Sequence, residues 1–140
     1  MLNAREFYTL ADWLATTQAN EVGFRTAINR VYYAAHLMAR EWLRKGNWEP
    51  RGRGDDHSGV IRELKSRGRL RQLGWMLDEL RELREHVDYH LESTESSLNR
   101  VCSHCTNARR SASDEPLVNE HHWNNVQEIS RQLLPRLESL

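Results

Sequence analysis

Residues 73–91, LGWMLDELRELREHVDYHL, decide the fold class of this 140-residue chain. Six side chains recur there in alternating steps of four and three residues, which places them on one face of a helix: Leu73, Leu77, Leu80, Arg84, Val87 and Leu91. Five of these six are apolar, and a row of this kind packs against another helix. The sixth is an arginine, so the stretch predicts a core helix that carries one cation on its inward face.

The rest of the chain shows the same helical periodicity and little of the alternation that a strand requires. We expect helices over about residues 3–19, 21–45, 57–67, 69–92 and 119–140. Gly46 predicts the end of the second helix, and Pro135 predicts a kink in the last helix or its early end. Loops are expected over 46–56 and, as a long insertion before the last helix, over 93–116. The chain therefore predicts a single domain, 1–140, built as an all-α bundle of about five helices.

The composition limits the classes of function. Lys and Arg together number 20, as do Asp and Glu, so the formal net charge is zero. This balance argues against wholesale electrostatic binding to nucleic acid but leaves room for a local basic patch. No apolar run approaches the roughly 18 residues that cross a bilayer, and the N-terminus has no apolar signal core. We therefore expect a cytoplasmic protein without a membrane span.

Arg84 and His90 are the first candidates for chemistry. At roughly 100° per residue they lie about 60° to either side of Val87, and about 9 Å apart along the helix axis. A guanidinium suits phosphate, and an imidazole exchanges a proton near neutral pH. Together they would cut a phosphodiester without a metal ion. The structural alternative is that Arg84 pairs with Asp88 one turn on, and that His90 is a rim residue.

Three stretches resemble the HEPN-domain family. Residues 25–35, RTAINRVYYAA, look like the signature of the family's second helix, and residues 57–61, HSGVI, resemble the start of its third. Residues 83–89, LREHVDY, are similar to the Arg-x-x-small-Asp-Tyr pattern of one subgroup. The three stretches follow the family's order, and the resemblance covers roughly residues 3–92 and, by position, the last helix. It implies an up-and-down helical bundle that forms a homodimer.

The resemblance also implies a function. Many HEPN members are metal-independent endoribonucleases with an Arg-x(4–6)-His motif, and Arg84 and His90 match this motif with five residues between them. Paired motifs meet at the dimer interface in such proteins, and members often accompany a small nucleotidyltransferase in toxin–antitoxin or defence modules. The resemblance therefore implies an RNA substrate, a homodimer and a nucleotidyltransferase partner.

Two residues beside Arg84 depart from the family pattern or compete with it. Glu85 stands where active members usually carry Asn, Asp or His, and its carboxylate would repel a phosphate. His86 forms a second frame with Arg81, with four residues between them.

Three more residues would support the site. Asp88 would hold Arg84 in place. Tyr89 would stack on a base, be modified, or pack within the bundle. Tyr32 and Tyr33 are adjacent and point about 100° apart on a helix, so one of them belongs to the core and the other, Tyr33 in our prediction, would reach the site.

The cysteines suggest a zinc site without establishing one. Cys102 and Cys105 form a Cys-x-x-Cys pair, and His121 and His122 follow at a spacing that zinc would accept. One such pair without a second does not predict zinc, and no thioredoxin-like pattern surrounds it. We therefore expect thiols without a ligand in a loop, no metal and no cofactor.

Three functions remain open from the sequence. The first is a HEPN-type metal-independent endoribonuclease that acts as a dimer, the toxin of a toxin–antitoxin or defence module. The second is a catalytically inactive HEPN-like binding module that docks a nucleotidyltransferase or RNA. The third is a purely structural helical partner. Basic residues around the first loop and the third helix do not decide among them, because acidic residues dilute these charges: Asp55, Asp56 and Glu63.

Overall fold

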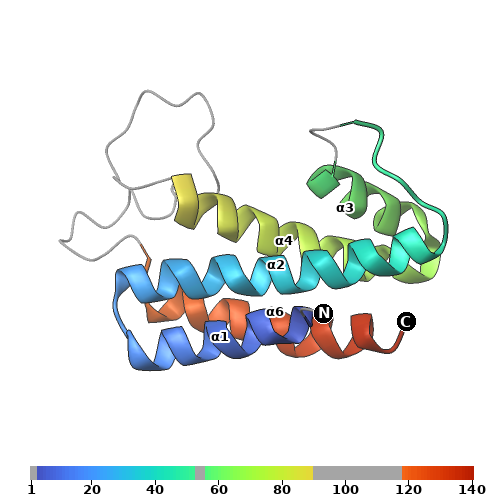
Figure 1. The fold of residues 1–140 in the computed structure, drawn as a ribbon. Coiled ribbons are helices and arrows are strands. Elements are labelled where there is room, and N and C mark those ends of the chain that lie inside the picture. Colours follow the sequence, from blue (N-terminus) through green and yellow to red (C-terminus); the bar gives the residue numbers. More distant parts are fainter. Residues whose placement is uncertain (1–2, 53–55, 90–117) are drawn as a thin grey trace, which may run out of the picture.

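A computed structural model describes residues 3–52, 56–89 and 118–140 of the chain. It contains α1 (Ala4–Thr17), α2 (Glu21–Lys45), α3 (Asp56–Ser66), α4 (Arg71–Tyr89) and α6 (Glu120–Glu138), with a 3-10 turn over Gly68–Leu70 (Figure 1). The described residues contain no strand. The prediction of an all-α bundle of about five helices is confirmed.

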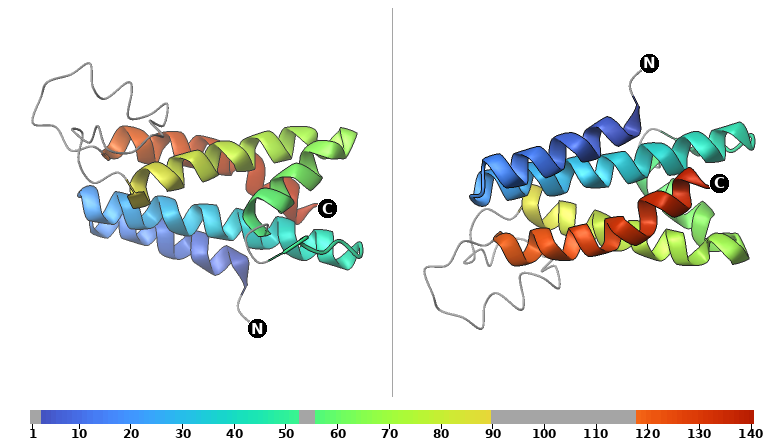
Figure 2. Two further views of the ribbon diagram at one scale, coloured as in Figure 1. Left: turned by 90° about the horizontal axis from the view of Figure 1, so that it is seen from above. Right: turned by 90° about the horizontal axis from the view of Figure 1, so that it is seen from below.

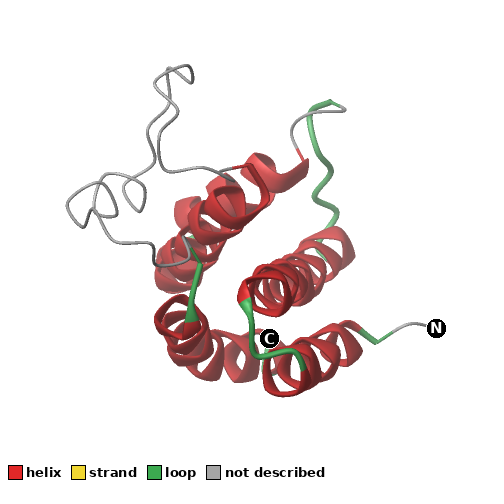
Figure 3. Ribbon diagram, turned by 90° about the vertical axis from the view of Figure 1, so that its left-hand side faces the viewer, coloured by secondary structure: helices red, strands yellow, loops and turns green. Residues whose placement is uncertain are grey.

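The long helix α2 is the centre of the bundle. It packs against each of the other four helices, and α4 also packs against α3 and α6. Successive long helices run in opposite directions (Figures 1 and 2), and the end view shows them grouped around a shared interior (Figure 3). The helices α4 and α6, which are distant from α2 in the sequence, therefore pack against it. Polar side chains of α2 and α4 meet where these two helices are in contact.

Capping residues set most of the helix ends. The side chains of Asn3, Asn20 and Asn119 each accept a backbone N–H from the first turn of the helix that follows. Gly46 ends α2 at the predicted residue. The helix α6 runs through Pro135 to Glu138, and its C-terminal part is bent, so the proline bends the helix without ending it (Figure 2).

The predicted row on α4 forms the core. Its apolar members within the described residues are almost fully buried, namely Leu73, Leu77, Leu80 and Val87. The apolar spacing of residues 7, 10, 11 and 14 predicts one inward face for α1, and this prediction is partly wrong, because Leu10 is 44 % exposed whereas Ala11 and Ala15 are buried. Among the described helices α1 packs mainly on α2, so it buries only a narrow side with small residues.

The close approach of α3 to α4 depends on Gly74. A Cβ atom at this position would lie 2.9 Å from the backbone nitrogen of Lys65 and 3.2 Å from the Cβ atom of Leu64. The Lys65 Nζ atom also pairs with the Asp78 carboxylate at 2.5 Å, which joins the two helices at their surface. The position of α3 is therefore fixed by a backbone contact that only glycine allows.

Two further predictions concern membrane spans and the long loop before the last helix. Within the described ranges, no helix has both the length and the apolar character needed to span a membrane. The predicted loop insertion over 93–116 lies outside the described residues, as does the predicted extension of the fourth helix to Glu92.

A glycine substitution tests the contact between α3 and α4. Replacing glycine by alanine inside a helix normally stabilises it by about 1 kcal/mol. We expect Gly74→Ala to lower the free energy of unfolding instead, by roughly 1–3 kcal/mol, because the added methyl group overpacks the interface. Urea unfolding followed by circular dichroism measures the change. Gly68→Ala is the matched control, since nothing lies within 4 Å of its Cβ position, and equal effects of the two changes would contradict the argument.

Candidate functional site

Arg84 leaves α4 toward α2 and is largely enclosed. Only 17 % of its side chain is exposed, and its Nε atom lies 2.7 Å from Oδ2 of Asp88, one helical turn further on. Its guanidinium carbon lies 5.9 Å from the ring centroids of both Tyr32 and Tyr33 on α2. The cation predicted on the inward face of the fourth helix is therefore held between a carboxylate and two aromatic rings.

Asp88 connects the two helices. Both of its carboxylate oxygens accept a hydrogen bond from Nδ2 of Asn29 on α2, at 3.0 and 2.8 Å. Nearby, Arg25 donates to the backbone oxygen of Val87 at 2.5 Å and to the carboxylate of Glu21. The expected pairing of Arg84 with Asp88 is present, and α2 supplies the second set of hydrogen bonds to the same carboxylate.

A second guanidinium lies beside Tyr33. The guanidinium carbon of Arg30 is 5.6 Å from the centroid of this ring, and its NH2 atom donates to Oδ1 of Asn29 at 2.9 Å. Among the described residues no carboxylate pairs with Arg30. Two cations thus lie within about 6 Å of the centroid of one tyrosine ring, an arrangement that suits a phosphate group beside a base.

His57, near the start of α3, lies against the rings of Tyr32 and Tyr33. Its Nδ1 atom is 2.7 Å from the hydroxyl oxygen of Tyr32, and its ring centroid is 5.9 Å from that of Tyr33. We name the following residues the Arg84 cluster: Asn29, Arg30, Tyr32, Tyr33, His57, Arg84 and Asp88. It joins side chains from α2, α3 and α4.

A polar network continues from this cluster along α2. The ring of His36 lies 4.3 Å from that of His57, and its Nε2 atom is 3.1 Å from Oδ2 of Asp56. Arg40 donates to the other oxygen of Asp56 at 2.7 Å. The network is anchored at its far end by an ionised carboxylate that two side chains of α2 share.

Burial and nearby charges set the ionisation of these groups. Burial, with the neighbouring His57, lowers the pKa of His36 to about 4. Burial and then the positive charge of Arg84 lower the pKa of His57, and burial raises the pKa of Tyr32. For Asp56 burial acts in the opposite direction, but the hydrogen bonds from His36 and Arg40 outweigh it and lower its pKa. At neutral pH both imidazoles and the phenol are therefore neutral.

Of the residues of α2, sequence reasoning predicted Tyr33 at the site but missed the polar side chains around it. The polar side chains of α2 recur close to every fourth residue, at positions 25, 29, 32 or 33, 36 and 40, and this spacing places them on one side of the helix. The same periodicity test that found the apolar rows would have found this polar row. His57 and Asp56 offered no such signal, because their position depends on how α3 is rotated against α2.

Two predicted residues beside Arg84 face elsewhere. The side chain of Glu85 is 47 % exposed, and its Oε1 atom lies 3.8 Å from Nε of Arg81. His86 is fully buried, and its ring stacks on that of His122 of α6 with centroids 5.6 Å apart. His86 thus faces α6, whereas Arg84 faces α2.

Several predicted residues cannot be placed in the cluster. His90, Cys102 and Cys105 lie outside the described residues, as does the side chain of Tyr89. On α6, His122 closes the first turn in a capping box with Asn119, and His121 is exposed. Within the described ranges, no group of three His, Cys, Asp or Glu side chains is arranged to hold a metal ion.

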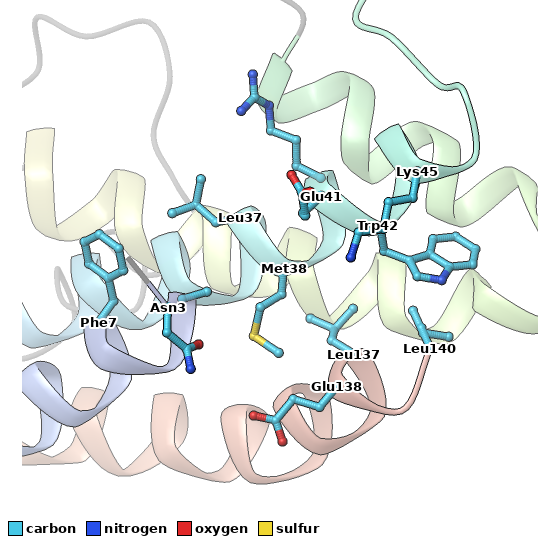
Figure 4. A pocket seen from close by; sticks show the side chains of 12 residues that line it. Asn3, Phe7, Leu37, Met38, Glu41, Trp42, Lys45, Leu137, Glu138 and Leu140 are labelled. Atoms are coloured by element: carbon cyan, nitrogen blue, oxygen red, sulfur yellow. The ribbon is translucent and has the colours of Figure 1, made fainter. Parts of the chain in front are cut away.

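A separate hollow lies between α1, α2 and α6. Its walls are mainly apolar, with charged groups at the rim (Figure 4). None of the predicted site residues lines it.

No family model, curated protein or solved structure matches the chain. The HEPN resemblance therefore depends on the three sequence stretches, and an argument for function depends on the geometry of the Arg84 cluster.

The buried histidine makes stability depend on pH. In the unfolded chain His36 takes up a proton near pH 6.5, but in the folded chain only near pH 4. The folded state is therefore destabilised as the pH falls through this interval, by about 3 kcal/mol for His36, and the lowered pKa of His57 acts in the same direction. Urea unfolding at neutral pH and at about pH 4 measures this loss.

His36→Gln tests the assignment, since glutamine keeps a hydrogen bond to Asp56 but does not titrate. We expect the loss of stability on acidification to shrink in this variant. His121→Gln, which removes an exposed histidine of α6, is the matched control and should leave the loss unchanged. An unchanged loss in His36→Gln would show that other groups carry it.

Proposed function

We propose that the protein is a HEPN-type metal-independent endoribonuclease and that Arg84 binds the phosphodiester that is cut. The observation that supports this most directly is the enclosed guanidinium, held between Asp88 and the rings of Tyr32 and Tyr33 with Arg30 beside it. Donors that are fixed in advance stabilise charge on phosphorus oxygens more than mobile ones, because they need no reorganisation during the reaction.

The surroundings of Arg84 fit this role. Asp88 is held by Asn29 as well as by Arg84, so its carboxylate is fixed and keeps the guanidinium in one orientation. Arg30 adds a second cation without a carboxylate partner among the described residues. Glu85, whose charge would repel a phosphate, lies toward Arg81 instead. The local balance of charge thus favours an anion although the whole chain is neutral.

The HEPN resemblance supplies the rest of the proposal. His90 follows Arg84 at the family's spacing and is the proposed proton carrier to the leaving 5′-oxygen. A homodimer would bring two such motifs together. The protein would act in the cytoplasm as the toxin of a toxin–antitoxin or defence module, with a nucleotidyltransferase as its partner and RNA as its substrate.

One observation favours a second candidate function. The ion pair between Arg84 and Asp88, at 2.7 Å, is what a purely structural arginine would also make. A HEPN-like binding module that has lost catalysis would keep this pair and dock a nucleotidyltransferase or RNA.

Cleavage of RNA in the presence of a chelator separates the two candidates. We expect the purified protein to cut single-stranded RNA in EDTA and Arg84→Ala to lose at least about 100-fold in rate, because the phosphate loses its charged donor. His90→Ala should lose a similar factor. Arg131→Ala, which removes an exposed arginine of α6, is the matched control and should cut normally.

Circular dichroism must show that each variant is folded. Full activity in both Arg84→Ala and His90→Ala would exclude these residues from the reaction. A wild-type protein that binds RNA or a nucleotidyltransferase but cuts nothing would support the binding module.

A further inference from the structure

His57 brings an imidazole to the same site from a different helix. Its ring contacts the ring of Tyr33, which in turn lies 5.9 Å from the guanidinium carbon of Arg84. His57 and Tyr33 are both partly exposed, so a bound chain could touch both. Arg84 and His57 therefore both lie against the ring of Tyr33. This pair of an arginine and a histidine is formed by described residues alone and does not require His90.

The ring of His57 is held in a fixed orientation. Its Nδ1 atom shares a 2.7 Å hydrogen bond with the hydroxyl of Tyr32, a side chain that is fully buried. The ring of His36 lies 4.3 Å away at a tilt of 32° and supports one side of it. The other ring nitrogen, Nε2, has no hydrogen-bond partner among the described residues. One nitrogen is thus anchored, and the other is available to a ligand.

The charged groups around His57 keep it ready to accept a proton. Burial and the charge of Arg84 favour the neutral ring, and Arg81 and Arg40 act in the same direction. Asp56 opposes them, and its carboxylate is already engaged by His36 and Arg40. The neighbouring His36 is only 2 % exposed and cannot reach a substrate, so its part is to support His57.

We propose that His57 is the general base of the Arg84 cluster and that Tyr32 is its positioning residue; this inference depends on the proposed nuclease function. In the neutral ring Nδ1–H donates to the Tyr32 oxygen, and the Nε2 lone pair faces the substrate. Nε2 takes the proton of an RNA 2′-hydroxyl while the 2′-oxygen forms a bond to phosphorus. The bond from phosphorus to the 5′-oxygen breaks, and the 5′-oxygen keeps the electron pair and takes a proton from His90, the proton carrier of the proposed function. His57 then gives up its proton to water and is ready for the next cycle.

The products follow from this step. They are one strand that ends in a 2′,3′-cyclic phosphate and a second strand that begins with a 5′-hydroxyl. The reaction needs a free 2′-hydroxyl, so DNA and 2′-O-methyl RNA would bind to the cluster without being cut. The substrate class is therefore single-stranded RNA, whose exposed bases can stack on Tyr33.

The first test compares His57→Gln with His121→Gln, the matched control on the surface of α6. We expect His57→Gln to lose at least about 100-fold in kcat and to lose the acidic limb of the pH–rate profile, while the control keeps both. Tyr32→Phe should lower kcat with little change in KM, because the base is present but is no longer held. A wild-type rate and pH profile in His57→Gln would overturn the inference.

A second measurement decides the matter if His57→Gln does not fold. Nuclear magnetic resonance of the wild-type histidine rings, titrated with a 2′-O-methyl oligonucleotide, should show the signals of His57 shift while those of His121 stay in place. Unmoved His57 signals at saturating oligonucleotide would overturn the inference. The proposed function fails separately, when the wild-type protein itself cuts no RNA or when Arg84→Ala cuts as fast as the wild type.

Discussion

The structure depends on how a cation is placed in the contact between α2 and α4. Arg84 occupies a position in a row of buried apolar residues, and a charge enclosed there without partners would destabilise the fold by several kcal/mol. Asp88 from the same helix and Asn29 from α2 supply those partners. The pairing of the two helices, and with it the register of their side chains, is therefore tied to a set of polar groups as well as to apolar contact.

The helix α2 carries two rows of side chains, an apolar row that forms the core and a polar row that contributes to the site. One row is made of small and branched apolar residues that let the neighbouring helices approach, and the other is the polar row from Arg25 to Arg40. The polar row faces α4 at its beginning, through Arg25 and Asn29, and α3 further along, through Tyr32 and His36. Polar side chains of α2 thus contact polar groups of both α3 and α4. This shared contact allows a site to form between the described helices.

Periodicity predicted the fold well and the site only in part. The bounds of α2 and the apolar row of α4 follow from the spacing of side chains along one helix, and Arg84 was found because it interrupts that row. The partners of Arg84 on α2 form a row of their own that the same test would find. His57 was not predictable in this way, because its nearness to Arg84 depends on how two helices from separate segments meet, and the spacing within either segment does not contain that information.

The contact at Gly74 has a consequence for how such a site can vary. Backbone and side-chain atoms of α3 lie where a methyl group would otherwise be, so this glycine acts as the spacer that sets how far the imidazole on α3 stands from the guanidinium on α4. The separation of the two chemical groups is then a property of the scaffold. A single carbon atom added at Gly74 would push α3 away from α4 near Leu64 and Lys65, and would thereby shift the helix that carries the imidazole although Gly74 itself does not line the site.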